Sequence, residues 1–190
     1  MPLAMVSSEP VQVYAALMAA RKGDPVEETL ARIIASAVCG FGAMPDWLGL
    51  GQQRFRLLMA EQFPAFDLSA LEFRRRVVDV ARSDEMDDLH RLLVANRSAD
   101  LEVESLMADI VIAGCMGEDH LWQDLGLWER SDLSRLMLEN FRPLALRNDK
   151  DMKWKKFLYK QLCETEGIYT CRSPSCEVCA DYASCFGPED

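Results

Sequence analysis

Five of the seven cysteines in this 190-residue chain lie between Cys163 and the last residue. Cys171, Cys176, Cys179 and Cys185 form the run C-x4-C-x2-C-x5-C. The C-x2-C unit lets two sulfurs face one metal centre, and the small, polar residues of the outer spacers let the other two thiolates fold back toward it. The spacing therefore predicts that these four cysteines bind a metal centre.

Three kinds of cysteine chemistry remain open on this spacing. Structural zinc sites usually separate two short cysteine pairs by a longer stretch, whereas here three unequal gaps follow one another. The opening C-x4-C-x2-C matches the run of plant-type ferredoxins, although their fourth cysteine lies farther along the chain. Disulfides are disfavoured by the odd number of cysteines and by a reducing compartment. The pattern favours an iron-sulfur cluster over zinc, and zinc over disulfides.

Composition limits the partners and the compartment. Twenty-one basic and 31 acidic residues give a net charge of −10, which argues against non-specific binding to nucleic acid or to anionic membranes. The longest uncharged stretch, residues 33–45, is too short to span a bilayer, and the first residues lack the pattern of a secretory signal. We therefore predict a soluble, cytoplasmic protein that binds neither nucleic acid nor membrane.

The rest of the chain shows helical periodicity and few strand signals. In residues 23–40, Asp24 is the predicted N-cap, Pro25 the first helical position, Glu27 the partner in a capping box and Gly40 the end. Hydrophobic content of 49% is ample for a core. Further helices are predicted within residues 66–83, 83–98, 99–117, 131–141 and 148–163, the last with Asn148 as its cap.

These patterns predict an all-α fold in a single domain over residues 1–190. The expected architecture is a compact bundle of about seven or eight short helices. Within it, residues 1–10 are expected to be disordered, residues 11–162 to form the helical body, and residues 163–190 to form an irregular cysteine-rich loop that binds metal.

Two residues outside the motif are candidates for additional metal ligands. His120 lies among acids, five residues after Cys115, and its alternative role is a helix cap or a surface group. Cys163 ends the last predicted helix directly before the motif, and its alternative role is a packed thiol. Cys39 and Cys115 stand in apolar strings and are predicted to be buried thiols, while His90 is interpreted as an ordinary helix residue.

Basic residues gather close to the motif. Lys153, Lys156 and Lys160 have the spacing i, i+3 and i+7, which puts them on one face of a helix, and Arg172 lies inside the cysteine run. Positive charge near a thiolate-bound cluster would stabilise the thiolates. The alternative is a solvated face whose lysines serve solubility.

Three stretches carry a resemblance to a known family: "GEDHLWQDLGLWERSDLSRLMLENF", "NDKDMKWKKFLYKQLCETEG" and "CRSPSCEVCADYASCFGPE". They resemble the NifQ family of nitrogen-fixation proteins, whose hallmark is the terminal C-x4-C-x2-C-x5-C motif. The resemblance covers roughly residues 114–189, with a weaker similarity in residues 44–64.

The resemblance implies more than the spacing does. Members of the family are iron-sulfur proteins that carry molybdenum within a cubane-type molybdenum-iron-sulfur cluster and supply it for the iron-molybdenum cofactor of nitrogenase. By the same resemblance, Cys171, Cys176, Cys179 and Cys185 would be the cluster ligands. Molybdate or another molybdenum source would load the protein, and the recipients would be the NifEN-type assembly scaffold and the NifH-type iron protein.

Two function classes follow, and neither is an enzyme. The chain contains no glycine-rich phosphate loop, no H-E-x-x-H and no nucleophile elbow, so the metal is expected to be cargo. The first class is a molybdenum carrier, for which the lysines would also attract the molybdate anion. The alternative class is a zinc-stabilised helical interaction module, in which the cysteine loop only holds the tail in place.

The division into a helical body and a cysteine loop leads to a first prediction. We expect Cys176→Ser to abolish binding of the metal centre but to leave the helical content largely intact, because the helical body has its own core. Metal analysis and far-ultraviolet circular dichroism of the same sample test both statements. Wholesale loss of helix would refute the division.

Overall fold

The structure, a computed structural model, describes residues 9–73, 83–166 and 182–186. Within these ranges the chain forms ten α-helices and two short 3-10 helices, with no strand. The predicted all-α class is therefore confirmed for the described residues. The count exceeds seven or eight because α6, α8 and α10 are single turns of four or five residues. None of the described helices is long and apolar enough to cross a membrane.

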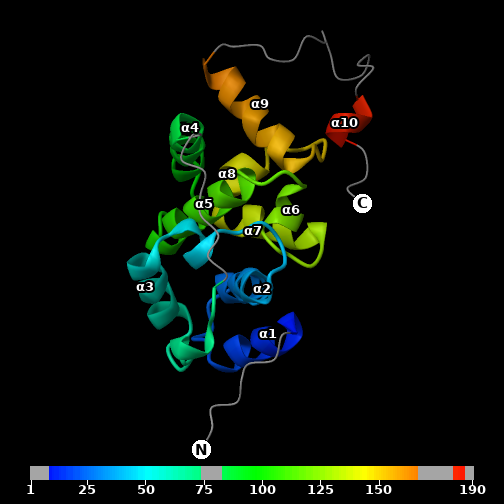
Figure 1. Ribbon diagram of the computed structural model, residues 1–190. Helices are drawn as coiled ribbons and strands as arrows, with labels where there is room; N and C mark the ends of the chain where they lie inside the picture. Colours follow the sequence, from blue (N-terminus) through cyan, green and yellow to red (C-terminus); the bar gives the residue numbers. More distant parts are fainter. Residues whose placement is uncertain (1–8, 74–82, 167–181, 187–190) are drawn as a thin grey trace, which may run out of the picture.

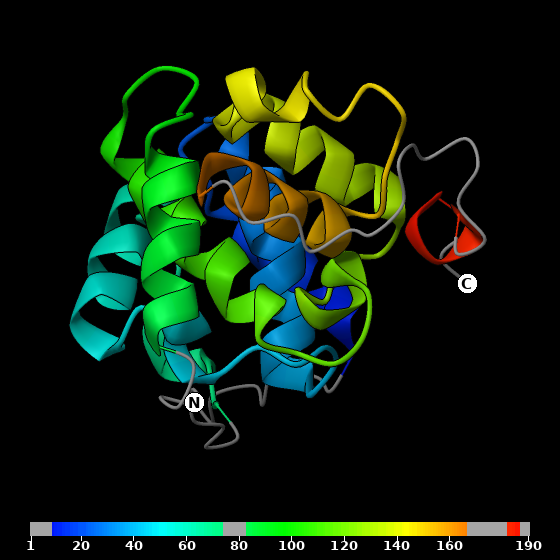
Figure 2. The same cartoon turned by 90° about the horizontal axis from the view of Figure 1, so that it is seen from above.

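The helices follow one another with short connections, and α5 lies in the middle of the molecule (Figure 1). Figure 2 shows the same arrangement from above, with α9 lying across the helices of the body. The bounds in chain order are α1 Pro10–Ala19, α2 Val26–Cys39, η1 Asp46–Gly49, α3 Gln52–Gln62, η2 Leu68–Ala70, α4 Ser83–Val94, α5 Glu102–Cys115, α6 Leu121–Asp124, α7 Arg130–Asn140, α8 Arg142–Ala145, α9 Trp154–Glu166 and α10 Tyr182–Phe186.

Helix α5 is buried on nearly all sides because its sequence is apolar on nearly all sides. Every residue from Ile110 to Cys115 is buried, and so are Leu106, Met107 and Ala108 one turn earlier. Such a helix is stable only inside a core, whereas surface helices keep one polar face. Helices α4 and α6 pack against it, so α5 connects the body to the short α6 that borders the candidate site.

Helix α2 ends as predicted but begins differently. Gly40 adopts a left-handed conformation with φ of 87° and closes the helix. At the start, the carboxylate of Glu27 accepts hydrogen bonds from the N–H groups of Lys22 and Gly23, at 2.8–3.0 Å. The predicted capping box between Glu27 and the N–H of Asp24 is therefore wrong, because the chain before α2 turns so that earlier amides reach the carboxylate.

The helix predicted over residues 66–83 is wrong for its described part. Only η2 is helical there, and Leu71 after it is extended, with φ of −96° and ψ of 121°. The Asp67 side chain accepts hydrogen bonds from the N–H and the hydroxyl of Ser69, at 2.9 and 2.8 Å. This local bonding offers the backbone an alternative to the α-helix. Residues 74–82 lie outside the described ranges.

The last long helix begins later than predicted. Asn148 does not cap it but closes a loop with Met152, whose N–H donates to the Asn148 side-chain oxygen at 2.8 Å. The Asn148 amide in turn donates to the Met152 carbonyl at 2.9 Å. Helix α9 then starts at Trp154, so Lys153 is the residue immediately before it.

A charged cluster joins α1, α2 and α7. Arg32 of α2 pairs with Asp132 of α7 and with Glu28 one turn earlier, the latter at 2.7 Å. Its guanidinium also lies over the rings of Tyr14 and Trp128, 5.8 and 5.4 Å from their centroids. The cation is therefore held by two carboxylates and two aromatic faces, which restricts how α2 and α7 pack.

The burial of this cluster leads to a second prediction. We expect Asp132→Ala to lower the free energy of unfolding by about 3 kcal/mol, because the Arg32 side chain, only 16% exposed, loses its buried partner. The control is Arg54→Ala, which breaks a pair with Asp109 in which the Arg54 side chain is 49% exposed; its cost is under about 1 kcal/mol. Urea unfolding measures both, and equal losses would contradict the prediction.

Candidate metal-binding site

Of the four cysteines of the motif, only Cys185 lies in the described part of the chain. Cys171, Cys176 and Cys179 lie outside it, as does Arg172, so their predicted roles are untested. No group of three or more histidine, cysteine or acidic residues suited to a metal occurs among the described residues. This finding does not bear on the predicted four-cysteine site, since three of its members are not described.

Cys185 is held on the body by the start of α9. The N–H of Lys153 donates to the Cys185 carbonyl at 2.8 Å, and the Lys153 ammonium donates to the Ala183 carbonyl at 3.3 Å. Cys185 is half-buried, and both it and Phe186 pack against the hydrophobic core. The short helix α10 is therefore attached beside the first turn of α9 (Figure 1).

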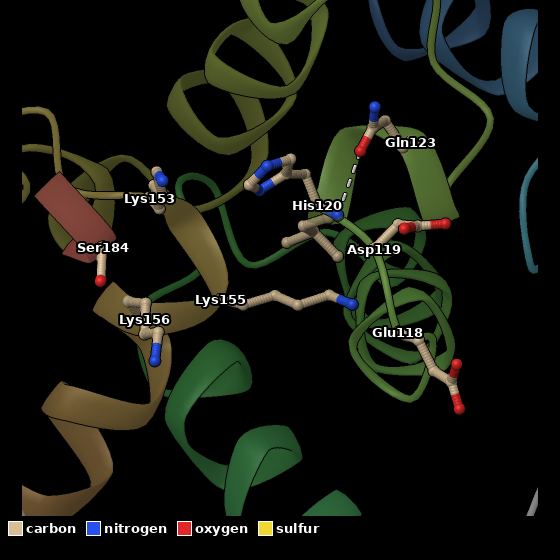
Figure 3. Close-up of a pocket in the computed structure, with 9 residues that line it drawn as sticks. Glu118, Asp119, His120, Gln123, Lys153, Lys155, Lys156 and Ser184 are labelled. Carbon is tan, nitrogen blue, oxygen red and sulfur yellow. Dashed lines mark hydrogen bonds between the residues drawn. The ribbon is translucent and has the colours of Figure 1, made fainter. Parts of the chain in front are cut away.

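A pocket of about 400 Å³ lies beside this attachment. Its walls come from the turn before α6, from the first turn of α9 and from α10 (Figure 3). The structure thus brings three sequence candidates, His120, Lys153 and Lys156, to one pocket, next to the helix that carries Cys185. The lining residues are Glu118, Asp119, His120, Leu121, Gln123, Lys153, Lys155, Lys156 and Ser184.

A buried ion pair fixes one side of this pocket. The ammonium of Lys155 pairs with the carboxylate of Asp124, which is 2% exposed, and donates to the Gly117 carbonyl at 2.8 Å. Gly117 packs so closely on this carboxylate that a Cβ there would lie 2.3 Å from the Asp124 Cγ. Since the charge of Lys155 is compensated, Lys153 and Lys156 supply the remaining lysine ammonium groups among the described residues of the wall.

His120 stands at the N-cap of α6. Its N–H donates to the side-chain oxygen of Gln123 at 3.2 Å, so its backbone has the capping role that we gave as the alternative. The ring is half-buried and lies on the side of the pocket where Lys153 is found (Figure 3). A role as metal ligand stays a prediction.

Lys160 does not join the other two lysines. Its ammonium lies 3.6 Å from Glu164, and its side chain borders a second hollow of about 230 Å³ together with Lys150 and Phe186. Of the three lysines predicted on one helical face, Lys160 therefore borders a different hollow, and its proposed role near the motif stays a prediction. It lies one turn farther along α9, beyond the turn that faces the pocket.

The remaining cysteines and the second histidine have separate surroundings. Cys115, 2% exposed, is a buried thiol as predicted, whereas Cys39 at the end of α2 is only half-buried. Cys163 is half-buried on α9. His90 lies on α4, where its Nε2 is 3.5 Å from an Asp109 carboxylate oxygen.

Sequence reasoning missed Asp124, Lys155 and Ser184. Lys155 lies among these lysines, but the i, i+3 and i+7 spacing on one helical face identified only Lys153, Lys156 and Lys160. Asp124 stands in the apolar stretch "WQDLGLW", and an acid in such surroundings is a signal of a buried, paired carboxylate. Nothing in the sequence indicated a role for Ser184 except its position next to Cys185.

Fold and site together define a class: a helical protein in which Cys185, the last cysteine of a C-terminal motif, lies in a short helix beside a partly basic pocket. The chain belongs to the NifQ family, whose profile matches residues 29–187 and so includes all four cysteines of the motif. Family membership gives the chain a role in nitrogen fixation, in the biosynthesis of the iron-molybdenum cofactor.

Similar proteins from three bacteria match most of the chain. The chain is 44% identical to "Protein NifQ" of Azotobacter vinelandii across 84% of this chain and 87% of that protein. It is 35% identical to "Protein NifQ homolog" of Sinorhizobium fredii across 83% and 68%, and 35% identical to "Protein NifQ" of Klebsiella pneumoniae across 77% and 90%. No solved structure matches the chain.

The buried pair beside the pocket leads to a third prediction. We expect Lys155→Met to destabilise the protein by about 3 kcal/mol, because the Asp124 carboxylate keeps its burial and loses its partner. Adding Asp124→Asn should recover part of this loss, since the double variant buries no unpaired charge. Urea unfolding of both single variants and the double variant measures the coupling. Lys150→Met, at an exposed lysine, is the control. Additive effects of the two substitutions would contradict the pairing.

Proposed function

We propose that this protein is a molybdenum carrier in the biosynthesis of the nitrogenase cofactor. It holds molybdenum within an iron-sulfur cluster on Cys171, Cys176, Cys179 and Cys185 and passes it on. The observation that carries the proposal is the C-x4-C-x2-C-x5-C motif, because the family match runs through all four of its cysteines.

The donor set suits such a cluster. Four thiolates are the usual ligands of iron-sulfur clusters, and thiolate is a soft ligand that accepts iron together with a second metal. Cys185 supports this choice, since it is half-buried and forms no disulfide with the other described cysteines. When bound, the cluster supplies the coordination that retains molybdenum until transfer.

The charges around Cys185 support the same proposal. A cluster on four thiolates is anionic, and it belongs to a chain whose net charge is already −10. Lys153 and Lys156 place two ammonium groups in the pocket beside α10, where they offset this charge locally. Arg172, inside the motif, is proposed to add a third cation.

Molybdenum needs more ligands than cysteine alone supplies, and His120 is the better candidate of the two. It shares the pocket with Ser184, the neighbour of Cys185. Cys163 lies nine residues along α9 from Trp154, which at 1.5 Å per residue is roughly 13 Å from the end where α10 is attached. The described geometry therefore favours His120 over Cys163 as an additional ligand.

The proposed role is delivery and not catalysis. The NifEN-type scaffold and the NifH-type iron protein are the proposed recipients, and molybdate or another molybdenum source supplies the metal. The support is family membership, together with the attachment of α10 at the edge of the body, where a partner can reach it.

The test is the content of molybdenum, iron, zinc and acid-labile sulfide per chain. The protein is purified without oxygen from molybdate-supplied cells that make iron-sulfur clusters. We expect iron, sulfide and molybdenum together, all lost in Cys176→Ser and Cys179→Ser and all kept in the control Cys39→Ser, which lies outside the motif.

Two other outcomes would contradict this function. Iron and sulfide without molybdenum would leave a cluster protein that carries no molybdenum. Near-stoichiometric zinc without sulfide would support the zinc-stabilised interaction module instead.

A further inference from the structure

We propose that the pocket beside α10 binds a tetrahedral oxyanion of the molybdate class. We call it the oxyanion pocket and define it by His120, Lys153, Lys156 and Ser184. The class of ligand is inferred from the pocket, whereas the choice of molybdate among such anions rests on the proposed function.

Donors from three parts of the chain line this pocket. Lys153 and Lys156 contribute two ammonium groups from the start of α9, Ser184 of α10 contributes a hydroxyl, and His120 contributes an imidazole (Figure 3). Ammonium groups hold oxyanions through charge-assisted hydrogen bonds, which are about twice as strong as neutral ones. Lys156 is exposed, and among the described residues no carboxylate pairs with it.

The first turn of α9 strengthens this preference. The helix has 13 residues, and residues of its first turn line the pocket. The N-terminal end of a helix carries a partial positive charge and attracts anions. Here this field acts in the same place as the two ammonium groups and adds to them.

The acids of the pocket lie on its opposite side. Glu118 and Asp119 line it too, but their carboxylates point away from His120, Lys153 and Lys156 (Figure 3). Both acids are exposed, and Lys155 is already neutralised by Asp124. Among the described residues of the lining, no acid therefore lies between Lys153 and Lys156 (Figure 3).

The pocket lies close to a proposed cluster ligand, which relates it to the proposed function. Ser184 precedes Cys185, so a bound oxyanion lies one residue along the chain from a proposed cluster ligand. A pocket of about 400 Å³ accommodates a tetrahedral oxyanion together with water. Molybdate held there would be concentrated beside the thiolates, in a chain whose net charge of −10 otherwise repels anions.

The experiment measures molybdate binding by equilibrium dialysis at low salt. The full chain is purified without oxygen from cells grown without added molybdate. We expect Lys153→Met/Lys156→Met to weaken binding at least about tenfold, since each ammonium supplies a charge-assisted bond. The control is Lys150→Met/Lys160→Met, which removes the same charge from the second hollow and should change affinity less than about twofold.

Two further variants separate the pocket from its neighbours. Lys156→Met alone should weaken binding. Among the described residues the hydrogen bonds to α10 come from Lys153 and not from Lys156, so detachment of that helix would not explain the loss. Cys176→Ser should bind molybdate as the unmodified chain does, because none of the described residues that line the oxyanion pocket is a cysteine. Loss of molybdate binding in Cys176→Ser would show that the thiolates bind the molybdate, and it would contradict the proposed oxyanion pocket.

Competition identifies the chemistry of the ligand. Tungstate and sulfate have the same shape and charge as molybdate and should displace it, whereas chloride at the same ionic strength should not. Displacement by chloride to the same extent would show that only general electrostatic attraction, which salt screens, holds molybdate on the protein. This outcome would contradict a specific binding site.

Absence of molybdate binding in the unmodified chain, or equal losses in the two double variants, would also overturn the proposal. Iron, sulfide and molybdenum contents of the chain from molybdate-supplied cells are measured in parallel. These contents test the carrier function independently. The proposal of an oxyanion pocket can therefore be disproved while the proposed cluster remains supported.

Discussion

The pairing of Asp124 with Lys155 is the constraint on which the site depends. A carboxylate that is 2% exposed must be paired, and its partner comes from the first turn of α9, 31 residues away. The Asp124 carbonyl also accepts a hydrogen bond from Ala43 at 2.8 Å, so the loop after α2 is bound at the same point. One buried charge therefore fixes α6, the start of α9 and a loop of the body relative to one another.

Lys153, Lys155 and Lys156 lie close together in the sequence but have different surroundings. Successive residues of a helix point about 100° apart, so Lys155 and Lys156 of α9 point in different directions. Lys155 points to the buried carboxylate, Lys153 attaches α10 through its backbone and its ammonium, and Lys156 stays exposed. Because Lys155 fixes the orientation of this turn, the other two lysines are placed at the pocket.

Sequence patterns predicted what depends on local chemistry. The end of α2 at Gly40 followed from the freedom of glycine at positive φ, and the burial of Cys115 in α5 followed from the apolar residues around it. The helix starts near Asp67 and Asn148 were wrong because these side chains bond to nearby backbone groups in non-helical turns. The pairing of Asp124 could not be predicted, since it joins segments that only the fold brings together.

A carrier must hold its cargo and also release it, and the attachment of α10 suits both. Lys153, the residue before α9, donates two hydrogen bonds to this five-residue helix, one from its backbone N–H at 2.8 Å and one from its ammonium at 3.3 Å. Short segments at the edge of a fold open at a lower free energy than the core does. The helices of the body pack around their own core, so α10 can leave its place without unfolding them. In the proposed function, release of molybdenum would then require local opening at Lys153 and not a change in the fold.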